Sequence, residues 1–370
     1  MGQRSWPRLA FTCAVALVVS ACSAATTPSS SPTATAPPVA AATATAGSTA
    51  PASFDPSLLP PPEVTSIKIA IGGIDPDTYA IKLALDAGLF KKYGLDAQYF
   101  QFNGATQTIQ ALVAKQIDVV TSTSTQTISL LGTGTPAVDI AELSTKLPDY
   151  LYAAKGITSA ADLKGKKAAV STLGSQAYQE VIVGMQQLGL KPTDMTITPI
   201  GGQSARVAAL ESGTVAIAAA DPGLAPKLAA DGIYPIVKLA DLPNVQFAGS
   251  NVMLLKSFVD ANPNTTLRIA AAVLEAIQLP FTNLPEVVSS YAKTAQLSQA
   301  DAQSYWQLYI KSGIMRDPRT TPAAYETART VLAALNPQAA SFDLSKAYDW
   351  SFLDKLKAMG LYAQLGIPTS

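Results

Sequence analysis

The stretch DAGLFKKYGLDAQYFQFNGATQTIQALVAKQIDVV, residues 86–120, holds the end of one helix, a strand, a second helix and a second strand. Gly88 suits the C-terminal cap of the first helix. The aromatic segment 96–102 predicts a strand, residues 105–116 a helix, and residues 117–122 the next strand. Because strands and helices alternate with short connections, we predict a parallel, doubly wound sheet.

The same alternation continues on both sides of this stretch. Upstream, residues 67–73 have the pattern of a buried strand that ends in Gly-Gly. Downstream, the pattern restarts after a kinked segment, and beyond a last strand at residues 251–257 the chain is almost entirely helical in pattern. This order predicts an α/β fold of two lobes, the second inserted into the first, with a helical C-terminal part. The expected boundaries are 64–155 with 243–370 for lobe 1, and 156–242 for lobe 2.

The N-terminus has the pattern of an export signal. Residues 1–21 combine basic residues with an apolar run at 9–19 that is too short to span a bilayer. VSAC, ending at Cys22, resembles a bacterial lipobox, so lipidation of Cys22 is expected; ordinary signal-peptidase cleavage is the alternative. Residues 22–63 are rich in Ala, Thr, Ser and Pro, which predicts a flexible tether. We therefore expect an exported chain, anchored by lipid to the cell membrane and facing the extracytoplasmic side.

Composition excludes several classes of protein. The chain has 26 basic and 26 acidic residues, which gives no basic surface for nucleic acid. It has no histidine, so Ser-His-Asp and Cys-His catalytic groups and His-ligated zinc sites are impossible. Later apolar runs are interrupted, for example by Glu275 and Pro280, which argues against a transmembrane helix after the signal. We expect neither an enzyme nor a bound cofactor or metal.

Two segments carry a family resemblance. The turn GLFKKYGL within residues 86–120 and the segment ITSAADLKGKKAAVSTLGSQAY, residues 157–178, resemble extracytoplasmic substrate-binding proteins of ABC importers. The likeness is strongest to the branch that handles sulfonates, nitrate, thiamine pyrimidines and riboflavin. It implies the type II periplasmic-binding-protein fold, a monomer, and an ABC permease with its ATPase as partners. The chain departs from the pattern at LPDYLYAAKG, residues 147–156, where an apolar strand is usual.

In doubly wound sheets, ligands bind beyond the carboxyl ends of the strands. Five segments of this chain are predicted to lie there, at 72–79, 102–106, 121–125, 171–178 and 219–223, and none contains Lys or Arg. Each candidate also has a structural interpretation, because Asn, Ser, Thr and Asp cap helices and tyrosines pack in cores. The candidate ligand-binding residues are Asp77, Tyr79, Asn103, Gly104, Thr106, Ser122, Thr123, Ser171, Gly174, Ser175, Tyr178 and Asp221.

The ligand class follows from these residues and the resemblance together. The candidate segments lack Lys and Arg, but they contain two carboxylates and several aromatic rings. This combination favours a neutral heterocycle, namely riboflavin or a thiamine-type pyrimidine. A sulfonate or nitrate-type anion held by helix N-termini is the alternative. A thiamine-pyrimidine-forming enzyme on the same fold and a purely structural lipoprotein are the remaining alternatives. The aromatic residues of SYWQLY, Tyr305, Trp306 and Tyr309, are expected in the core of lobe 1.

Overall fold

The computed structural model describes residues 54–74, 76, 78–102, 104–242, 246–312 and 314–368. The predicted signal peptide, the lipidation site Cys22 and most of the tether lie outside the described residues. The same holds for two candidate ligand-binding residues, Asp77 and Asn103.

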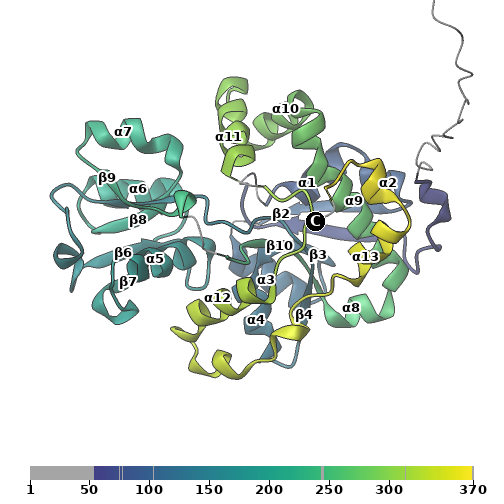
Figure 1. Cartoon of the computed structure of the whole chain (residues 1–370), viewed down its shortest axis with the longest axis horizontal. Coiled ribbons are helices and arrows are strands. Elements are labelled where there is room, and N and C mark those ends of the chain that lie inside the picture. Colours follow the sequence, from purple (N-terminus) through teal and green to yellow (C-terminus); the bar gives the residue numbers. More distant parts are fainter. Residues whose placement is uncertain are drawn as a thin grey trace, which may run out of the picture. The chain divides into compact units, whose positions relative to one another are not determined.

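Two five-stranded sheets organise the described part of the chain (Figure 1). The first sheet has the order β2-β1-β3-β10-β4, and the second has the order β7-β6-β8-β5-β9. The strands of the first sheet are β1 (Ser66–Ile71), β2 (Asp96–Gln101), β3 (Val119–Thr123), β4 (Ala137–Glu142) and β10 (Ser250–Leu255). Those of the second are β5 (Tyr150–Ala153), β6 (Lys167–Val170), β7 (Thr196–Pro199), β8 (Ile217–Ala220) and β9 (Tyr234–Lys238).

The insertion of one lobe into the other is confirmed, since β5 to β9 all lie between β4 and β10 in sequence. The prediction of purely parallel sheets is wrong. In the first sheet β10 runs antiparallel to β3 and β4, and in the second β5 runs antiparallel to β8 and β9. Residues 150–153 form β5 of the second sheet, although the sequence predicts them in lobe 1. The segment LPDYLYAAKG does contain a strand after all.

Helices cover both faces of the first sheet because its side chains alternate between them. Ile67, Ile69 and Ile71 of β1 pack in a core with α1, α9 and α13, whereas Ala70 packs with α3 on the opposite face. The helices around this sheet are α1 (Ala80–Asp86), α2 (Leu89–Lys92), α3 (Ala105–Val113), α4 (Ser124–Leu131), α8 (Lys256–Ala261) and α9 (Pro263–Thr282). The C-terminal part adds α10 (Leu284–Ala295), α11 (Gln299–Ser312), α12 (Pro322–Ala333), α13 (Ser351–Ala358) and α14 (Leu361–Gln364).

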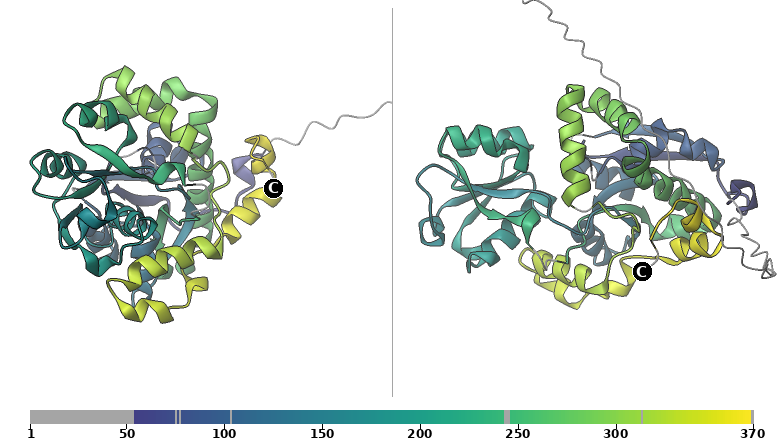
Figure 2. Two further views of the ribbon diagram at one scale, coloured as in Figure 1. Left: turned by 60° about the vertical axis from the view of Figure 1, so that its left-hand side comes forward. Right: turned by 45° about the horizontal axis from the view of Figure 1, so that its top comes forward.

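The second sheet is likewise covered on both faces. Leu151 and Val170 pack against α5 (Gln176–Gln187), while Tyr152 and Ala169 pack against α6 (Gln203–Glu211) and α7 (Ala225–Ala230). Figure 2 shows these teal helices on the two sides of the sheet from other directions. In doubly wound folds, ligands bind beyond the carboxyl ends of the strands.

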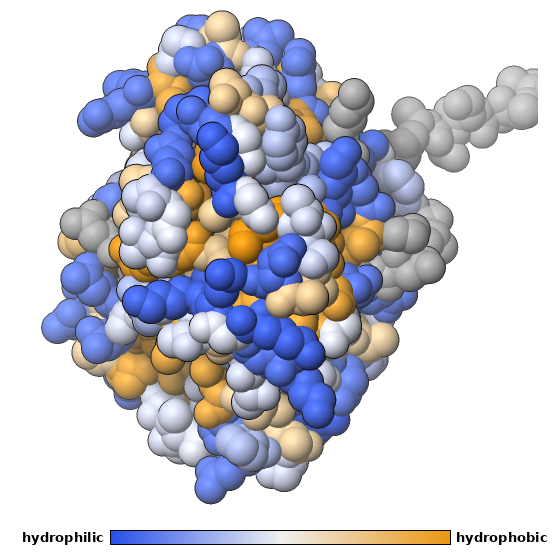
Figure 3. Space-filling model, turned by 90° about the vertical axis from the view of Figure 1, so that its left-hand side faces the viewer, coloured by the Kyte–Doolittle hydropathy of each residue, from blue (hydrophilic) through white to orange (hydrophobic). Residues whose placement is uncertain are grey.

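In the part of the chain that the structure describes, no helix is long and apolar enough to cross a membrane. On the face shown in Figure 3, polar and apolar residues are interspersed.

Asp139 fastens the C-terminal part of the chain to the edge of the first sheet. Its carboxyl accepts hydrogen bonds from Thr127 Oγ1 at 2.7 Å and from the Tyr325 hydroxyl on α12 at 2.8 Å. Its backbone pairs with the segment around Tyr348, which covers the edge of β4. Complete burial raises the pKa of Asp139 to about 8, although both donors oppose this.

This raised pKa predicts a pH-dependent stability. Between about pH 4 and pH 8 folded Asp139 keeps a proton that the unfolded chain releases, so the free energy of unfolding decreases as pH rises through that window. We expect the contribution to approach about 1 kcal/mol per pH unit and to be absent from Asp139→Asn. Urea unfolding of both proteins at pH 5 and pH 8 measures the difference.

Asp260→Asn is the matched control, because Asp260 lies on the surface of α8 beside Lys256. It should follow the pH profile of the unmodified protein. Parallel profiles for Asp139→Asn and the unmodified protein would contradict a protonated Asp139.

Candidate functional site

One cavity of about 330 Å³ lies where the strand ends of the two sheets meet. Residues of both lobes line it, including Gly72 after β1, the end of β3, Ser171 after β6 and Asp221 after β8. The first residue of β10, Ser250, lines it as well, because this strand is antiparallel and starts at the edge where the others end. Six of the predicted site residues line this cavity: Gly104, Ser122, Thr123, Ser171, Ser175 and Asp221.

Four other predicted residues are placed elsewhere. Thr106 is exposed on α3, and Gly174 contributes its backbone carbonyl to a contact with Thr125 Oγ1 at 2.8 Å. Tyr178 is 1% exposed and packs in the core between α5 and the second sheet, where burial raises its pKa to about 12. Tyr178 is therefore a core residue and not a wall of the cavity.

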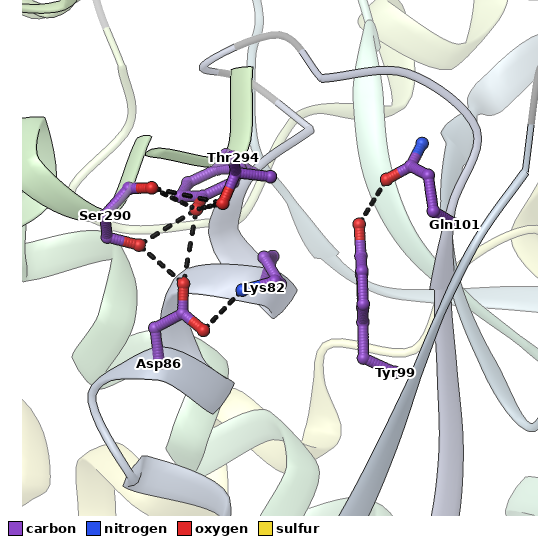
Figure 4. Close-up of polar contacts among 7 residues, drawn as sticks. Lys82, Asp86, Tyr99, Gln101, Ser290 and Thr294 are labelled. Atoms are coloured by element: carbon purple, nitrogen blue, oxygen red, sulfur yellow. Dashed lines mark hydrogen bonds and ion pairs between the residues drawn. The ribbon is translucent and has the colours of Figure 1, made fainter. Parts of the chain in front are cut away.

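Tyr79 is also in the core, and its predicted role in stacking on a ligand is not met. Its hydroxyl contacts Ser290 Oγ at 2.9 Å and Thr294 Oγ1 at 2.8 Å, both on α10, and donates to Asp86. Figure 4 shows Asp86, Ser290 and Thr294 pointing toward one another, with Lys82 beside Asp86. The aromatic ring packs edge-to-face against Tyr291 of α10, with the ring centroids 5.1 Å apart.

A buried arginine lines the cavity, which corrects the expectation that it contains no cation. Arg206 on α6 is 6% exposed. Its guanidinium donates to the carbonyl of Gly201 at 3.0 Å and twice to that of Ala219 at 3.3 Å. Arg206 lies outside the predicted strand-end segments, and it reaches the cavity because a helical side chain points back toward the N-terminus of its helix.

The cavity also holds two carboxyl groups that sequence reasoning missed, Asp149 and Glu180. Glu180 on α5 is completely buried. Burial, and next the negative charge of Asp149, raise the pKa of Glu180 well above its usual value, while Arg206 opposes the shift. Asp149 directly precedes β5, in the segment that departs from the family pattern. The third carboxyl in the cavity belongs to Asp221. Burial raises its pKa, whereas hydrogen bonds from the Tyr305 hydroxyl and the Gly223 N–H act in the opposite direction.

Two tyrosines of α11 form part of the wall. Tyr305 and Tyr309 both line the cavity, whereas Trp306 is 2% exposed in the core of lobe 1. Tyr305 packs against the core of lobe 1 and Tyr309 is 6% exposed, so the expectation of core positions holds in part, but both tyrosines also line the cavity. Residues i and i+4 share one face of a helix, and here that face turns toward the cavity.

Hydrogen bonds join the two lobes at the cavity. Thr125 of α4 donates to the Gly174 carbonyl and accepts from Gln179 Nε2 at 2.5 Å. Ser250 Oγ contacts Gln176 Oε1 at 3.4 Å, and the Tyr305 hydroxyl donates to Asp221. In the described residues, no group of three or more His, Cys, Asp or Glu could hold a metal ion.

Two lobes that line one cavity with their strand ends have the architecture of the periplasmic-binding-protein fold. A family model described as NMT1/THI5-like matches residues 75–285, more than half of the chain. The chain belongs to the NMT1/THI5-like family. No curated protein sequence matches it significantly.

Solved structures share the fold. A protein from Bordetella bronchiseptica RB50 is 25% identical with a TM-score of 0.66, over 81% of this chain and 99% of that one. The periplasmic aliphatic sulphonate-binding protein SsuA from Escherichia coli is 20% identical with a TM-score of 0.59, over 75% and 94%. The periplasmic nitrate-binding protein NrtA from Synechocystis PCC 6803 is 16% identical with a TM-score of 0.64, over 84% and 93%. One structure with this fold is an enzyme, the desulfurization enzyme DSZB, at 15% identity and a TM-score of 0.55, over 80% and 99%.

The cavity wall predicts a contrast between two glycine substitutions. A Cβ at Gly72 would lie 2.7 Å from Thr108 Oγ1 and 2.9 Å from the backbone carbon of Gly104. Gly72→Ala should therefore displace the start of α3 and lower the free energy of unfolding by about 1–3 kcal/mol. Chemical denaturation of the variant measures this loss.

Gly202→Ala is the control, because Gly202 lines the same cavity and a Cβ there meets nothing within 4 Å. It should cost less than about 1 kcal/mol. Equal losses for the two variants would show that the contact at Gly72 is easily relieved.

Proposed function

We propose that the chain is the substrate-binding component of an ABC importer, which captures a small organic nutrient and delivers it to the permease. The observation that carries this proposal is the cavity of about 330 Å³ lined by strand ends from both lobes. Its volume is within the range of small-molecule sites. The names of two proteins of the same fold, SsuA and NrtA, agree with a binding function.

In the proposed mechanism, ligand stabilises a closed form by contacting both lobes. Thr125, Gly174 and Gln179 already join the lobes by hydrogen bonds beside the cavity, so a ligand would add to existing contacts. The closed form is the one that docks on the permease and its ATPase. Lipidation of Cys22, with residues 22–63 as a tether, would keep the binder near that permease on the extracytoplasmic face.

For the ligand we propose riboflavin or a thiamine-type pyrimidine. The cavity walls combine Tyr305 and Tyr309, which suit a flat ring, with many hydroxyl and amide groups that suit polar ring edges. The second candidate is a sulfonate or nitrate-type anion, which the names of SsuA and NrtA favour. Among the described lining residues, three carboxyl groups stand against an anion, and the single guanidinium there, Arg206, already donates to backbone carbonyls.

An enzymatic function has less support. The fold also occurs in the enzyme DSZB, so the fold alone does not decide the question. A pyrimidine-forming relative would use histidines, and this chain has none. A binding function does not require histidine, so the absence of histidine does not count against it.

A ligand panel tests the proposed function. The full-length chain is titrated with riboflavin, followed by flavin fluorescence, and with a thiamine-type pyrimidine, ethanesulfonate and nitrate, followed by melting temperature. We expect saturation near one equivalent for one compound and a smaller radius of gyration in solution scattering when it is bound. Binding of the anions alone would keep the importer function and replace the ligand. A structural lipoprotein would show neither stabilisation nor compaction with any compound.

Tyr305→Phe tests whether closure supports binding. The substitution removes the hydrogen bond that joins α11 of lobe 1 to Asp221 of lobe 2. A hydrogen bond to a charged group contributes about 1.5–3 kcal/mol, so the affinity for the identified ligand should fall by roughly tenfold or more.

Tyr150→Phe is the matched control, because the Tyr150 hydroxyl contacts Asp241 within lobe 2. It should bind as the unmodified protein does. Unchanged affinity in Tyr305→Phe would mean that the bond between the lobes plays no part in the bound state.

A further inference from the structure

Two buried oxygen atoms in the wall of the cavity receive no hydrogen bond from the described residues. They are Thr121 Oγ1, on β3 of lobe 1, and Glu180 Oε2, on α5 of lobe 2. Thr121 is 5% exposed and Glu180 is completely buried, so both atoms are shielded from solvent. Because an unpaired buried polar atom costs free energy, a ligand that pairs with these atoms gains affinity.

Other polar groups of the wall already have partners. Ser122 Oγ donates to the side-chain oxygen of Gln126, and Gln203 Oε1 accepts from the backbone N–H of Asp221 at 2.9 Å. Unpaired oxygens are therefore not a general property of this wall. They mark one point on each lobe, which are the two points that a bridging ligand has to reach.

The neighbours of Glu180 fix the orientation of its carboxyl group. Oε1 accepts a hydrogen bond from Gln176 Nε2 at 3.1 Å, one turn earlier on α5. The amide of Gln176 is oriented in turn by Ser250 of lobe 1, whose Oγ lies 3.4 Å from Gln176 Oε1. Asp149 and the guanidinium of Arg206 act on the charge of Glu180, but neither donates a hydrogen bond to Oε2. Oε2 is therefore the oxygen left for a ligand.

The two oxygen atoms require different ligand groups. A carboxylate oxygen only accepts hydrogen bonds, whereas a hydroxyl group donates or accepts. Glu180 therefore selects an N–H or O–H group, and Thr121 pairs with a polar atom of either kind. Nitrate and ionised sulfonates carry no such donor, so they leave Glu180 Oε2 unpaired.

We propose that the ligand bridges these two atoms, with an N–H group on one edge that donates to Glu180 Oε2 and a polar atom on the opposite edge that pairs with the Thr121 hydroxyl. Glu180 and Thr121 are then specificity-determining residues of the cavity, and the substrate class is a neutral heterocycle that carries an amide-type or amino N–H. This inference rests on the proposed function and deepens it, because it names the ligand group that each lobe recognises.

Paired probes that differ in one nitrogen group test this assignment. Lumiflavin is compared with 3-methyllumiflavin, and 4-amino-2-methylpyrimidine with its 4-dimethylamino analogue, while ethanesulfonate and nitrate serve as anions. Titration calorimetry of the full-length chain at pH 8 measures each affinity. At least one N–H probe should bind, about tenfold or more tightly than its methylated counterpart and than either anion.

Glu180→Gln replaces the acceptor by a donor. Because Gln176 Nε2 donates to the oxygen at the Oε1 position, the new NH2 group lies at the Oε2 position and opposes the N–H group of the ligand. Affinity for the N–H probe should fall at least about tenfold, and its preference over the methylated counterpart should disappear. Glu211→Gln is the matched control, since Glu211 pairs with Lys227 at the surface of the same lobe and should leave both quantities unchanged.

Thr121→Val separates recognition from folding, and it serves where Glu180→Gln does not fold. The substitution removes a hydroxyl that has no partner among the described residues, so the melting temperature should not fall. Affinity for the N–H probe should nevertheless fall about fivefold or more. Thr266→Val is the matched control, because the buried Thr266 hydroxyl on α9 donates to the Asn262 carbonyl at 2.8 Å and lies outside the cavity wall. It should leave the affinity unchanged.

The results separate this inference from the proposed function. Tightest binding by ethanesulfonate or nitrate, or equal affinities within both probe pairs, overturns the inference and leaves the importer function standing. An unchanged affinity in Glu180→Gln or in Thr121→Val overturns the role of the residue concerned. Absence of binding by every probe, with no compaction of the chain, counts against the importer function itself, and the inference falls with it.

Discussion

The direction of one strand in each sheet determines where the cavity is and what lines it. The chain crosses from lobe 1 to lobe 2 before β5 and returns before β10, and both strands run antiparallel to their neighbours. Each therefore begins at the edge where the parallel strands end. Tyr150 pairs with Ala220 and Ser250 pairs with Thr123, so the residues at both crossings lie among the strand ends. The crossing segments and the cavity thus lie in the same region of the molecule.

The C-terminal helices add a second link between the lobes. Helix α12 contacts α4 of the first lobe and α5 of the second, and Val331 of α12 packs in the core of the second lobe. The Tyr325 hydroxyl of the same helix bonds to buried Asp139 of β4. Since α4 and α5 begin at the cavity, a change in the distance between the lobes also has to be accommodated by α12.

Sequence reasoning located the strand ends and, through them, Ser122, Thr123, Ser171, Ser175 and Asp221. These residues follow from local patterns, because a strand followed by Gly or Ser and a helix has a recognisable composition. Arg206, Tyr305 and Tyr309 were not predicted at the cavity, because they reach it from within helices whose orientation depends on tertiary packing. Asp149 was not predicted there either, because β5 has only four residues and no alternation that distinguishes it from a loop. Tyr79 and Tyr178 were predicted at the cavity but lie in the core. A tyrosine that follows a strand end can point toward the cavity or into the core, and the local pattern does not distinguish the two.

Two completely buried acids illustrate how a structural carboxyl differs from a candidate ligand group. Asp139 and Glu180 are both completely buried, and burial raises the pKa of each. Both oxygens of Asp139 have hydroxyl donors, Thr127 and Tyr325, so its site is complete within the protein. Glu180 lines the cavity, and no donor among the described residues reaches its Oε2. A buried acceptor without a donor lowers the stability of the fold. A ligand that supplies the donor would recover this free energy on binding.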